Sequence, residues 1–317
     1  MSDPTVVVYD PITTIRWSYD VEREALAGKG VRLVLPADLA ASRAALPEAD
    51  VVVTSGHLPD DDLALMTRCR GIVCYSVGMD GVNASLAAEM GIEVTNLPGY
   101  CTEEVSDQAV AMLLALQRLL VPTAAAAARG EWEIRDWDEF YRMRRVRGQT
   151  VGVVGVGRIG TRVVEKVRGL DMTAIGHDPF RTEAPFPLVS LDELLERSDA
   201  VVLCAALTAG SRHVIDAAAI ARMRDDAVLV NVARGGLVDE AALAAALRAG
   251  RLRGAALDVR EVEPTPPDDD PLLGLRNVIL TQHVGATSVE AFADIHTIAV
   301  ERILDLLGRH GLVGATR

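Results

Sequence analysis

Three polar side chains that could perform acid–base and carboxylate chemistry each follow a strand-like apolar run in the second half of the sequence. They are Arg234, Glu263 and His283. Open α/β sheets bind ligands at the carboxyl ends of their strands, so these side chains are expected to meet at one edge of one sheet. An arginine fork can hold a carboxylate and polarise a carbonyl, and a histidine beside a carboxylate can donate a proton near neutral pH. The set is typical of a site that reduces the carbonyl of a 2-oxo acid.

Each of these residues also has an ordinary structural explanation. Arg234 could form a surface ion pair, and Glu263 could be a solvated loop acid before Pro264. A lone histidine is more often structural than catalytic. The joint placement of the three after successive strands favours the chemical interpretation. The other histidines have no arginine and acid at comparable strand ends, although His57 follows a strand-like run in the first third and could face a cleft.

A glycine-rich stretch predicts where a hydride donor binds. Gly155, Gly157 and Gly160 follow a valine-rich run in a Gly-x-Gly-x-x-Gly spacing and open a helix-like segment. The first glycine allows a tight turn, the second lets the backbone approach a pyrophosphate, and the third lets the helix pack on the sheet. Asp178 ends the next strand-like run, at the position that binds an adenosine ribose. Its charge favours NAD over NADP, although Arg181 weakens that preference.

Strand-like and helix-like segments alternate in both parts of the chain. Strands are expected at 6–9, 31–35, 51–54, 71–75, 151–155, 172–176, 200–204, 227–232, 254–258 and 277–281. Helices are expected at 22–28, 39–46, 60–70 and 288–307. An apolar face at helical spacing predicts the longest helix of the chain, capped by Thr102 and kinked or restarted at Pro122. Such alternation predicts parallel sheets with helices on both faces.

The sequence therefore predicts an α/β protein of two doubly wound parallel-sheet domains. A Rossmann dinucleotide-binding domain at 99–286 is inserted into a discontinuous, flavodoxin-like substrate domain at 1–98 and 287–317, because the last helix is expected to return to the first domain. The aromatic segment 131–141 predicts an interface or pocket wall, with local packing under a loop as the alternative. A loop rich in proline and acids is expected at 264–270.

Composition narrows the classes of partner. A net charge of −13 argues against binding nucleic acid or an anionic membrane. The sequence shows no apolar run long enough to span a bilayer and no signal peptide. The four cysteines form neither a Cys-x-x-Cys pair nor a metal-ligand grouping, which predicts free thiols, a cytoplasmic location and no bound metal.

Over nearly its whole length the sequence resembles the D-isomer-specific 2-hydroxyacid dehydrogenases. The matching stretches are 153–160, 231–240, 254–259, 263–264 and 277–283. Within that family, residues 100–109 and 130–132 resemble the branch related to the C-terminal-binding-protein corepressors. That branch contains bacterial enzymes as well as NADH-sensing eukaryotic partners of transcription factors.

The resemblance implies a role for each candidate residue. Arg234 would anchor the substrate, His283 would act as acid/base, and Glu263 would be its partner. The implied NAD contacts lie at Arg158, Ile159, Asp178, Thr208, Ala233, Asp258 and Gly285, beside the three glycines. Backbone N–H groups at Val77 and Gly78 would hold the substrate carboxylate, with His57 nearby. The family is usually homodimeric through the long-helix region.

Several positions depart from the family pattern. Gln282 and Ala206 each stand where a proline is usual, Gln108 stands where the branch often has histidine, and 285–287 lacks the corepressor branch's tryptophan. The loop 54–57 lacks the arginines that 3-phosphoglycerate dehydrogenases use for phosphate. The leading hypothesis is therefore an NAD-dependent reductase of a small 2-oxo acid. An NAD(H)-sensing regulatory protein on the same fold, and a dehydrogenase of phosphite or a phosphonate-bearing acid, stay open as alternatives.

Overall fold

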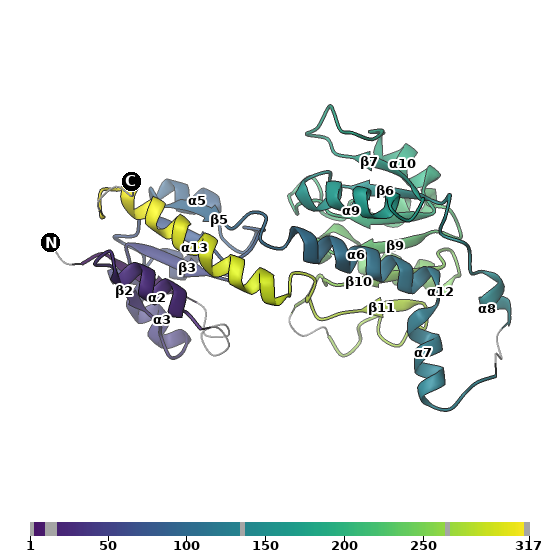
Figure 1. The fold of residues 1–317 in the computed structure, drawn as a ribbon, viewed down its shortest axis with the longest axis horizontal. Coiled ribbons are helices and arrows are strands. Elements are labelled where there is room, and N and C mark those ends of the chain that lie inside the picture. Colours follow the sequence, from purple (N-terminus) through teal and green to yellow (C-terminus); the bar gives the residue numbers. More distant parts are fainter. Residues whose placement is uncertain (1–2, 10–17, 134–136, 264–266, 314–317) are drawn as a thin grey trace. The chain divides into compact units, whose positions relative to one another are not determined.

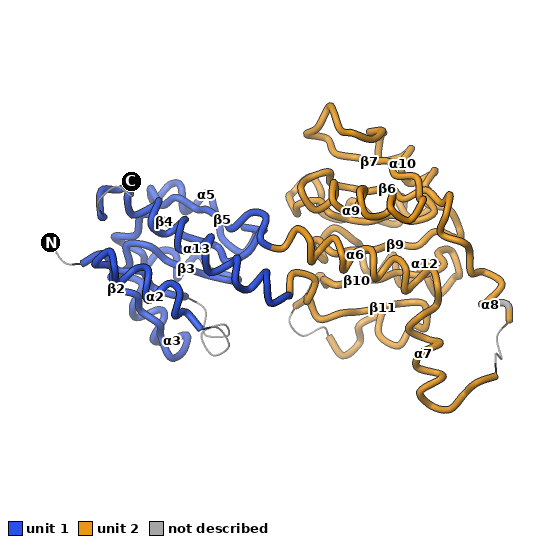
Figure 2. Tube along the Cα trace, in the orientation of Figure 1, with its two compact units in different colours: residues 1–100, 288–317 blue, residues 101–287 orange. Residues whose placement is uncertain are grey.

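The structure, a computed structural model, describes residues 3–9, 18–133, 137–263 and 267–313 (Figure 1). The chain divides into unit 1, residues 1–100 and 288–317, and unit 2, residues 101–287 (Figure 2). The predicted domain boundaries, 98/99 and 286/287, differ from these by two residues and by one. Both units are built around a parallel sheet, and the predicted fold class is confirmed.

The sheet of unit 1 has the flavodoxin-like strand order β2-β1-β3-β4-β5. Its strands are β1 (Thr5–Val8), β2 (Arg32–Val34), β3 (Val51–Thr54), β4 (Gly71–Cys74) and β5 (Glu93–Asn96). The strand β5 was not predicted from the sequence. This strand lies at the sheet edge, is only half-buried and has one apolar residue, Val94, so it lacks the continuous apolar run that marks the central strands.

Helices cover both faces of this sheet. Val6 and Val8 point to the face covered by α2 (Asp20–Ala27) and α13 (Val289–Arg309). Val7 points to the face of α3 (Leu39–Ala45), η1 (Leu46–Glu48), α4 (Asp60–Leu63) and α5 (Ala84–Glu89). The C-terminal helix is thus part of the core of unit 1. The helix expected at 60–70 is wrong beyond Leu63, where turns replace it.

The sheet of unit 2 is parallel throughout, in the order β11-β10-β9-β8-β6-β7. Its strands are β6 (Thr150–Val154), β7 (Thr173–His177), β8 (Ala200–Leu203), β9 (Val228–Asn231), β10 (Gly254–Leu257) and β11 (Val278–Leu280). A parallel β-bridge between Gly176 and Leu188 stands beside β7, in the place of a further strand. When this bridge is included, the sheet contains the strand order of the usual dinucleotide-binding fold. The direction of the strand order reverses between β6 and β8, where such folds bind their ligands.

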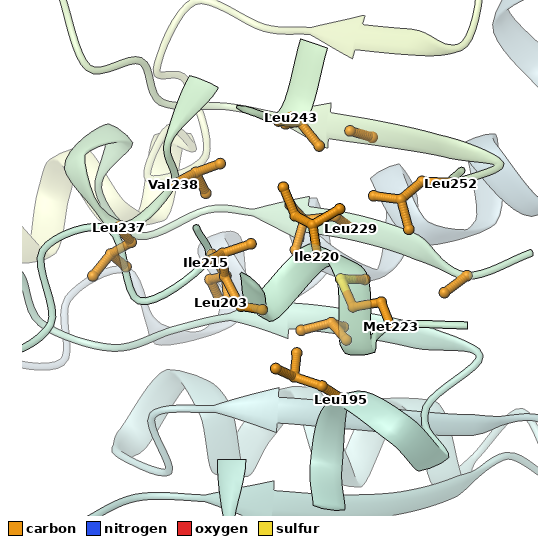
Figure 3. Close-up of a cluster of buried hydrophobic side chains, with 14 of the residues drawn as sticks. Leu195, Leu203, Ile215, Ile220, Met223, Leu229, Leu237, Val238, Leu243 and Leu252 are labelled. Carbon is orange, nitrogen blue, oxygen red and sulfur yellow. The ribbon is translucent and has the colours of Figure 1, made fainter. Parts of the chain in front are cut away.

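In unit 2, α6 (Thr102–Gln117) and α9 (Arg158–Arg168) pack on one face of the sheet (Figure 1). The Lys166 ammonium joins them by donating to Ser106 Oγ (2.7 Å) and Asp107 Oδ1 (2.6 Å). The other face carries α10 (Leu191–Arg197), α11 (Ala217–Arg222) and α12 (Glu240–Arg248) over a core that includes Leu203, Ile220 and Leu229 (Figure 3). This core fixes the strand ends that bear the candidate residues.

Three predictions about the long helix are wrong. Thr102 is its first residue and not its cap, because the N-cap residue is Cys101. The helix ends at Gln117, and Leu119 has a left-handed φ of 50° before α7 (Leu120–Ala128) begins. The break therefore precedes Pro122, which lies in the first turn of α7, where its missing N–H is not needed. The longest described helix is α13, with 21 residues against 16 in α6.

The segment after α7 includes α8 (Trp137–Tyr141), whereas residues 134–136 of the predicted aromatic segment lie outside the described residues. So do residues 264–266, the first part of the predicted proline-rich loop. In the described chain, none of the helices is by itself long and apolar enough to cross a bilayer, and the bent pair α6–α7 passes that test only when taken together.

Candidate active site

The turn between β6 and α9 has the geometry of a phosphate-binding loop. Gly155 has a φ of 89°, and a Cβ there would lie 2.4 Å from the Ala205 nitrogen. A Cβ at Gly160 would lie 2.0 Å from the Gly155 carbonyl oxygen. Both positions therefore require glycine. A Cβ at Gly157 would meet open space, and no side chain caps the start of α9, so its first N–H groups can receive an anion. Arg158 is exposed and Ile159 half-buried in this first turn.

Asp178 follows β7 and is anchored to that loop. Its Oδ2 accepts from the Val156 N–H and its Oδ1 from the Phe180 N–H, both at 2.9 Å. A carboxylate has about four lone-pair sites, so these two bonds leave acceptor capacity for ribose hydroxyls. The open space at Gly157, the uncapped start of α9 and the remaining acceptor capacity of Asp178 therefore fit a dinucleotide.

The turn after β9 places Arg234. The buried Asn231 accepts from the Ala233 N–H (3.0 Å) and donates from Nδ2 to the Arg234 carbonyl (2.8 Å). A Cβ at Gly235 would lie 1.9 Å from the Arg260 carbonyl carbon, so the turn packs directly on the chain after β10. Thr208, also predicted to contact NAD, exchanges hydrogen bonds with Ser211 in a turn after β8.

Asp258 holds the turn that carries His283. Its carboxylate accepts from the Thr281 hydroxyl, the Val284 N–H (3.1 Å) and the Gly285 N–H (2.8 Å). Its carbonyl accepts from the His283 N–H at 2.8 Å. His283 has a left-handed φ of 54°, a conformation that these bonds impose. Gln108 of α6 also donates to Thr281 Oγ1 (3.3 Å). Asp258, predicted as a cofactor contact, thus uses both oxygens within the protein.

His283 and Glu263 form a pair. His283 Nδ1 lies 2.7 Å from Glu263 Oε2, and Glu263 Oε1 accepts from the Arg260 N–H at 2.7 Å. The hydrogen bond to Glu263 raises the pKa of His283 above its usual value, against partial burial and the charge of Arg234. Partial burial opposes ionisation of Glu263, but the bonds from His283 and Arg260 outweigh it and lower its pKa. The pair therefore favours a protonated imidazole beside an ionised carboxylate.

Arg260 is a positioning residue that the sequence analysis missed. Its guanidinium forms two bonds with Glu240 (3.0 and 2.8 Å) and one with Asp270 (2.6 Å), and all three side chains are largely buried. The partners are 20 and 10 residues away in the chain, so no local motif marks them. The role of Asn231 was not predicted for a different reason, because its side chain bonds the backbone of its own turn.

We expect Arg260→Met to destabilise the protein by about 3–5 kcal/mol, because it leaves buried carboxylates at Glu240 and Asp270 unpaired. The measurement is denaturant unfolding of wild type and variant. Arg222→Met is the control, since its exposed ion pairs with Asp192 and Glu196 contribute little. Equal stability of the two variants would show that the buried cluster does not hold the loop.

The predicted substrate contacts belong to unit 1. Val77 and Gly78 follow β4, and their carbonyls accept from Asn96 Nδ2 (2.6 Å) and Ser76 Oγ (2.5 Å), respectively. His57 is exposed in the loop after β3. A Cβ at Gly81 would lie 2.6 Å from the Gly56 carbonyl oxygen, so the loops after β3 and β4 touch. Their part in binding substrate stays a prediction.

Comparisons with known proteins show the family to which the chain belongs. Residues 110–285 match the family described as D-isomer specific 2-hydroxyacid dehydrogenase, NAD binding domain. The D-3-phosphoglycerate dehydrogenase of Methanocaldococcus jannaschii is 38% identical over 272 residues, which cover 83% of this chain and 50% of that protein. The hydroxypyruvate reductase of Thermotoga maritima is 34% identical over 270 residues, covering 83% and 86%. Thus the chain spans half the length of the first relative and most of the second.

A solved structure extends the similarity to both units. The D-lactate dehydrogenase of Aquifex aeolicus, complexed with NAD and lactic acid, has a TM-score of 0.82 to this chain at 26% identity, and the match covers 99% of each chain.

Proposed function

The chain belongs to the D-isomer-specific 2-hydroxyacid dehydrogenase family, and on this premise we propose that it is an NAD-dependent reductase of a small 2-oxo acid. The product would be the 2-hydroxy acid of D configuration. The observation that carries this proposal is the 2.7 Å contact between His283 and Glu263, on turns locked by Asp258 and Arg260. A protein that only senses NAD(H) needs no such proton donor.

The proposed mechanism assigns a role to each of the three candidate residues and to the two residues that position their turns. Arg234 holds the substrate carboxylate with its fork and polarises the adjacent carbonyl. Bound NADH supplies the hydride. His283 donates a proton from Nε2 to the developing alkoxide, while Glu263 holds the ring through Nδ1 and stabilises its charge. Asn231 and Asp258 position the two turns.

The proposed substrate carries no phosphate. The loop at 54–57 contains neither arginine nor lysine, so its one side chain that can carry a positive charge for a phosphate group is His57. Of the two relatives, the hydroxypyruvate reductase is matched over 86% of its length and the D-3-phosphoglycerate dehydrogenase over 50% of its own, which favours a small acid. We therefore expect glyoxylate, hydroxypyruvate or pyruvate to be reduced in preference to phosphorylated acids.

The test is loss of NADH absorbance with a panel of 2-oxo acids and a phosphonate analogue, together with phosphite oxidation in the reverse assay. Turnover of one small oxo acid supports the proposal. If no member of the panel is turned over while NADH still binds, the alternative of an NAD(H)-sensing regulatory protein is favoured. If phosphite alone is oxidised, the alternative of a phosphite dehydrogenase is favoured. The same panel with NADPH tests the NAD preference, which rests on the negative charge of Asp178 beside Val156.

The pH profile provides a further prediction. Reduction needs protonated His283, so the rate should be constant at low pH and should fall as pH rises through the raised pKa, above the usual 6.5. Glu263→Gln removes the main cause of that rise and should move the falling limb to lower pH. The measurement is kcat/KM from pH 5 to 10. An unmoved limb would mean that another group sets it.

We propose that the protein is a cytoplasmic homodimer formed through the region of α7 and α8. The helix α7 is apolar, yet none of its residues is buried, and Leu120 at its start is 59% exposed. Trp132, which follows α7, and Tyr141, which ends α8, are 83% and 79% exposed. Such exposed apolar area marks an interaction surface. Sedimentation velocity distinguishes a dimer from a monomer, and Leu120→Asp should weaken a dimer formed there.

The proposed cytoplasmic location is supported by the thiols. Burial raises the pKa of thiols such as Cys69 to about 12, and buried free thiols suit a reducing compartment.

A further inference from the structure

Among the residues that the structure describes, Arg253 is a buried cation that no carboxylate contacts directly. It lies directly before β10 and is 8% exposed. Its interactions in the described structure are hydrogen bonds to neutral acceptors, from Nη1 to the Arg142 carbonyl (3.1 Å) and from Nη2 to Gln117 Oε1. A buried charge without a counter-charge in direct contact is costly, so this arrangement calls for an anion.

Three of the five guanidinium N–H donors take no part in these two bonds, and Nε has no acceptor. The nearby acids are engaged elsewhere. Asp226 pairs with Arg144 at 2.8 Å, and Asp199 accepts from the Thr150 N–H (2.8 Å) and lies 3.4 Å from Arg224. Burial lowers the pKa of Arg253 and is the main influence, Asp226 and Asp199 act against it, and Arg142 and Arg144 lower the pKa further. Two carboxylates therefore act on Arg253 from nearby, but within the described residues neither forms an ion pair or hydrogen bond with it.

A cavity of about 70 Å³ adjoins this guanidinium. Its polar lining comes from Gln117, Arg142, Arg253 and Asn277, and Leu116, Leu119 and Met143 complete the wall. A single water needs only about 10–15 Å³, so the cavity is large enough for the several oxygens of a small oxyanion. Arg253 precedes β10 and Asp258 follows it, which places the cavity at the opposite edge of the sheet from the candidate active site.

We propose that this cavity is a second ligand site, which binds a small oxyanion between Arg253 and Arg142. The anion would be inorganic phosphate or the carboxylate of a small metabolite. Its charge would compensate the buried guanidinium, and its oxygens would accept from the unused donors. The site does not depend on the proposed catalytic activity, since none of its residues belongs to the catalytic set.

The experiment is thermal unfolding with saturating NADH, which fills the pyrophosphate loop, at constant ionic strength with increasing inorganic phosphate. We expect a saturable rise in Tm, about 4 °C at a hundredfold excess over Kd. Arg253→Met should abolish the rise. Arg142→Met, at an exposed position on the cavity wall, should weaken it and serves if the first variant does not fold. Arg222→Met should behave as wild type. A parallel titration with malonate distinguishes a carboxylate ligand from phosphate.

Three outcomes would overturn the proposal. The first is that neither anion produces a saturable rise. The second is an equal rise in Arg142→Met and Arg222→Met, which would place the bound anion elsewhere. The third is loss of dimer in Arg253→Met without any anion effect in wild type, which would assign the counter-charge to a second copy of the chain.

Discussion

Replacing His283 by alanine is expected to lower kcat for 2-oxo acid reduction by about 10²–10⁴-fold, the usual contribution of a positioned general acid. The side chain is half-exposed and takes no part in the core, so its loss leaves the fold in place. The turn itself is held by Asp258 through backbone N–H groups, which alanine retains. The phosphate loop is equally untouched, and NADH affinity should therefore be that of wild type.

The measurement is steady-state turnover combined with NADH binding by fluorescence. His310→Ala is the matched control, since that histidine is exposed at the end of α13 in unit 1. Near-normal turnover of His283→Ala, with the control also active, would remove His283 from the proposed mechanism. Loss of NADH binding in His283→Ala would instead point to a structural role for the residue.

Replacing Arg234 by alanine is expected to lower kcat/KM by about 30- to 5,000-fold, the equivalent of losing one partner of a desolvated charge pair, 2–5 kcal/mol. Its carbonyl is held by Asn231 and its turn packs on Arg260 through Gly235, so the backbone should persist without the side chain. Lysine keeps the charge but not the planar fork, so Arg234→Lys should recover only a small part of the loss.

The readouts for Arg234 are kcat and KM for the oxo acid and, separately, the Kd for NADH. Arg222→Ala controls for the loss of one positive charge, because Arg222 pairs on the surface with Asp192 and Glu196. Full recovery by Arg234→Lys would mean that charge alone suffices and that no bidentate contact forms. A change confined to NADH affinity would assign the residue to the cofactor.

The sequence alone was sufficient for the fold class and for most strands of both sheets. Central parallel strands are buried on both faces, so each appears as a continuous apolar run that needs no tertiary information. The glycine spacing after β6 was equally legible, because turn geometry and close packing at Gly155 and Gly160 admit no side chain. The edge strand β5 was missed because an edge needs no such run.

The position of the helix break at Leu119 was also not predicted from the sequence. Pro122 is a strong local signal for interruption, but proline fits the first turn of a helix, so the break lies three residues earlier. The end of α4 was also mispredicted. Its acidic first turn indicates where the helix begins but contains no signal for where it ends.

At the candidate site, the sequence supplied the residue types, and the tertiary structure decided which of them touch. Arg234, Glu263 and His283 could be named from their positions after strands, because parallel strands bring such positions to one sheet edge. Three features could not be predicted from the sequence: the ion pairs of Arg260, the hydrogen bonds from the His283 turn to Asp258, and the cavity beside Arg253. These depend on side chains that meet across 10 to 136 residues of chain, and burial and hydrogen-bond satisfaction between distant segments leave no periodic trace in a single sequence.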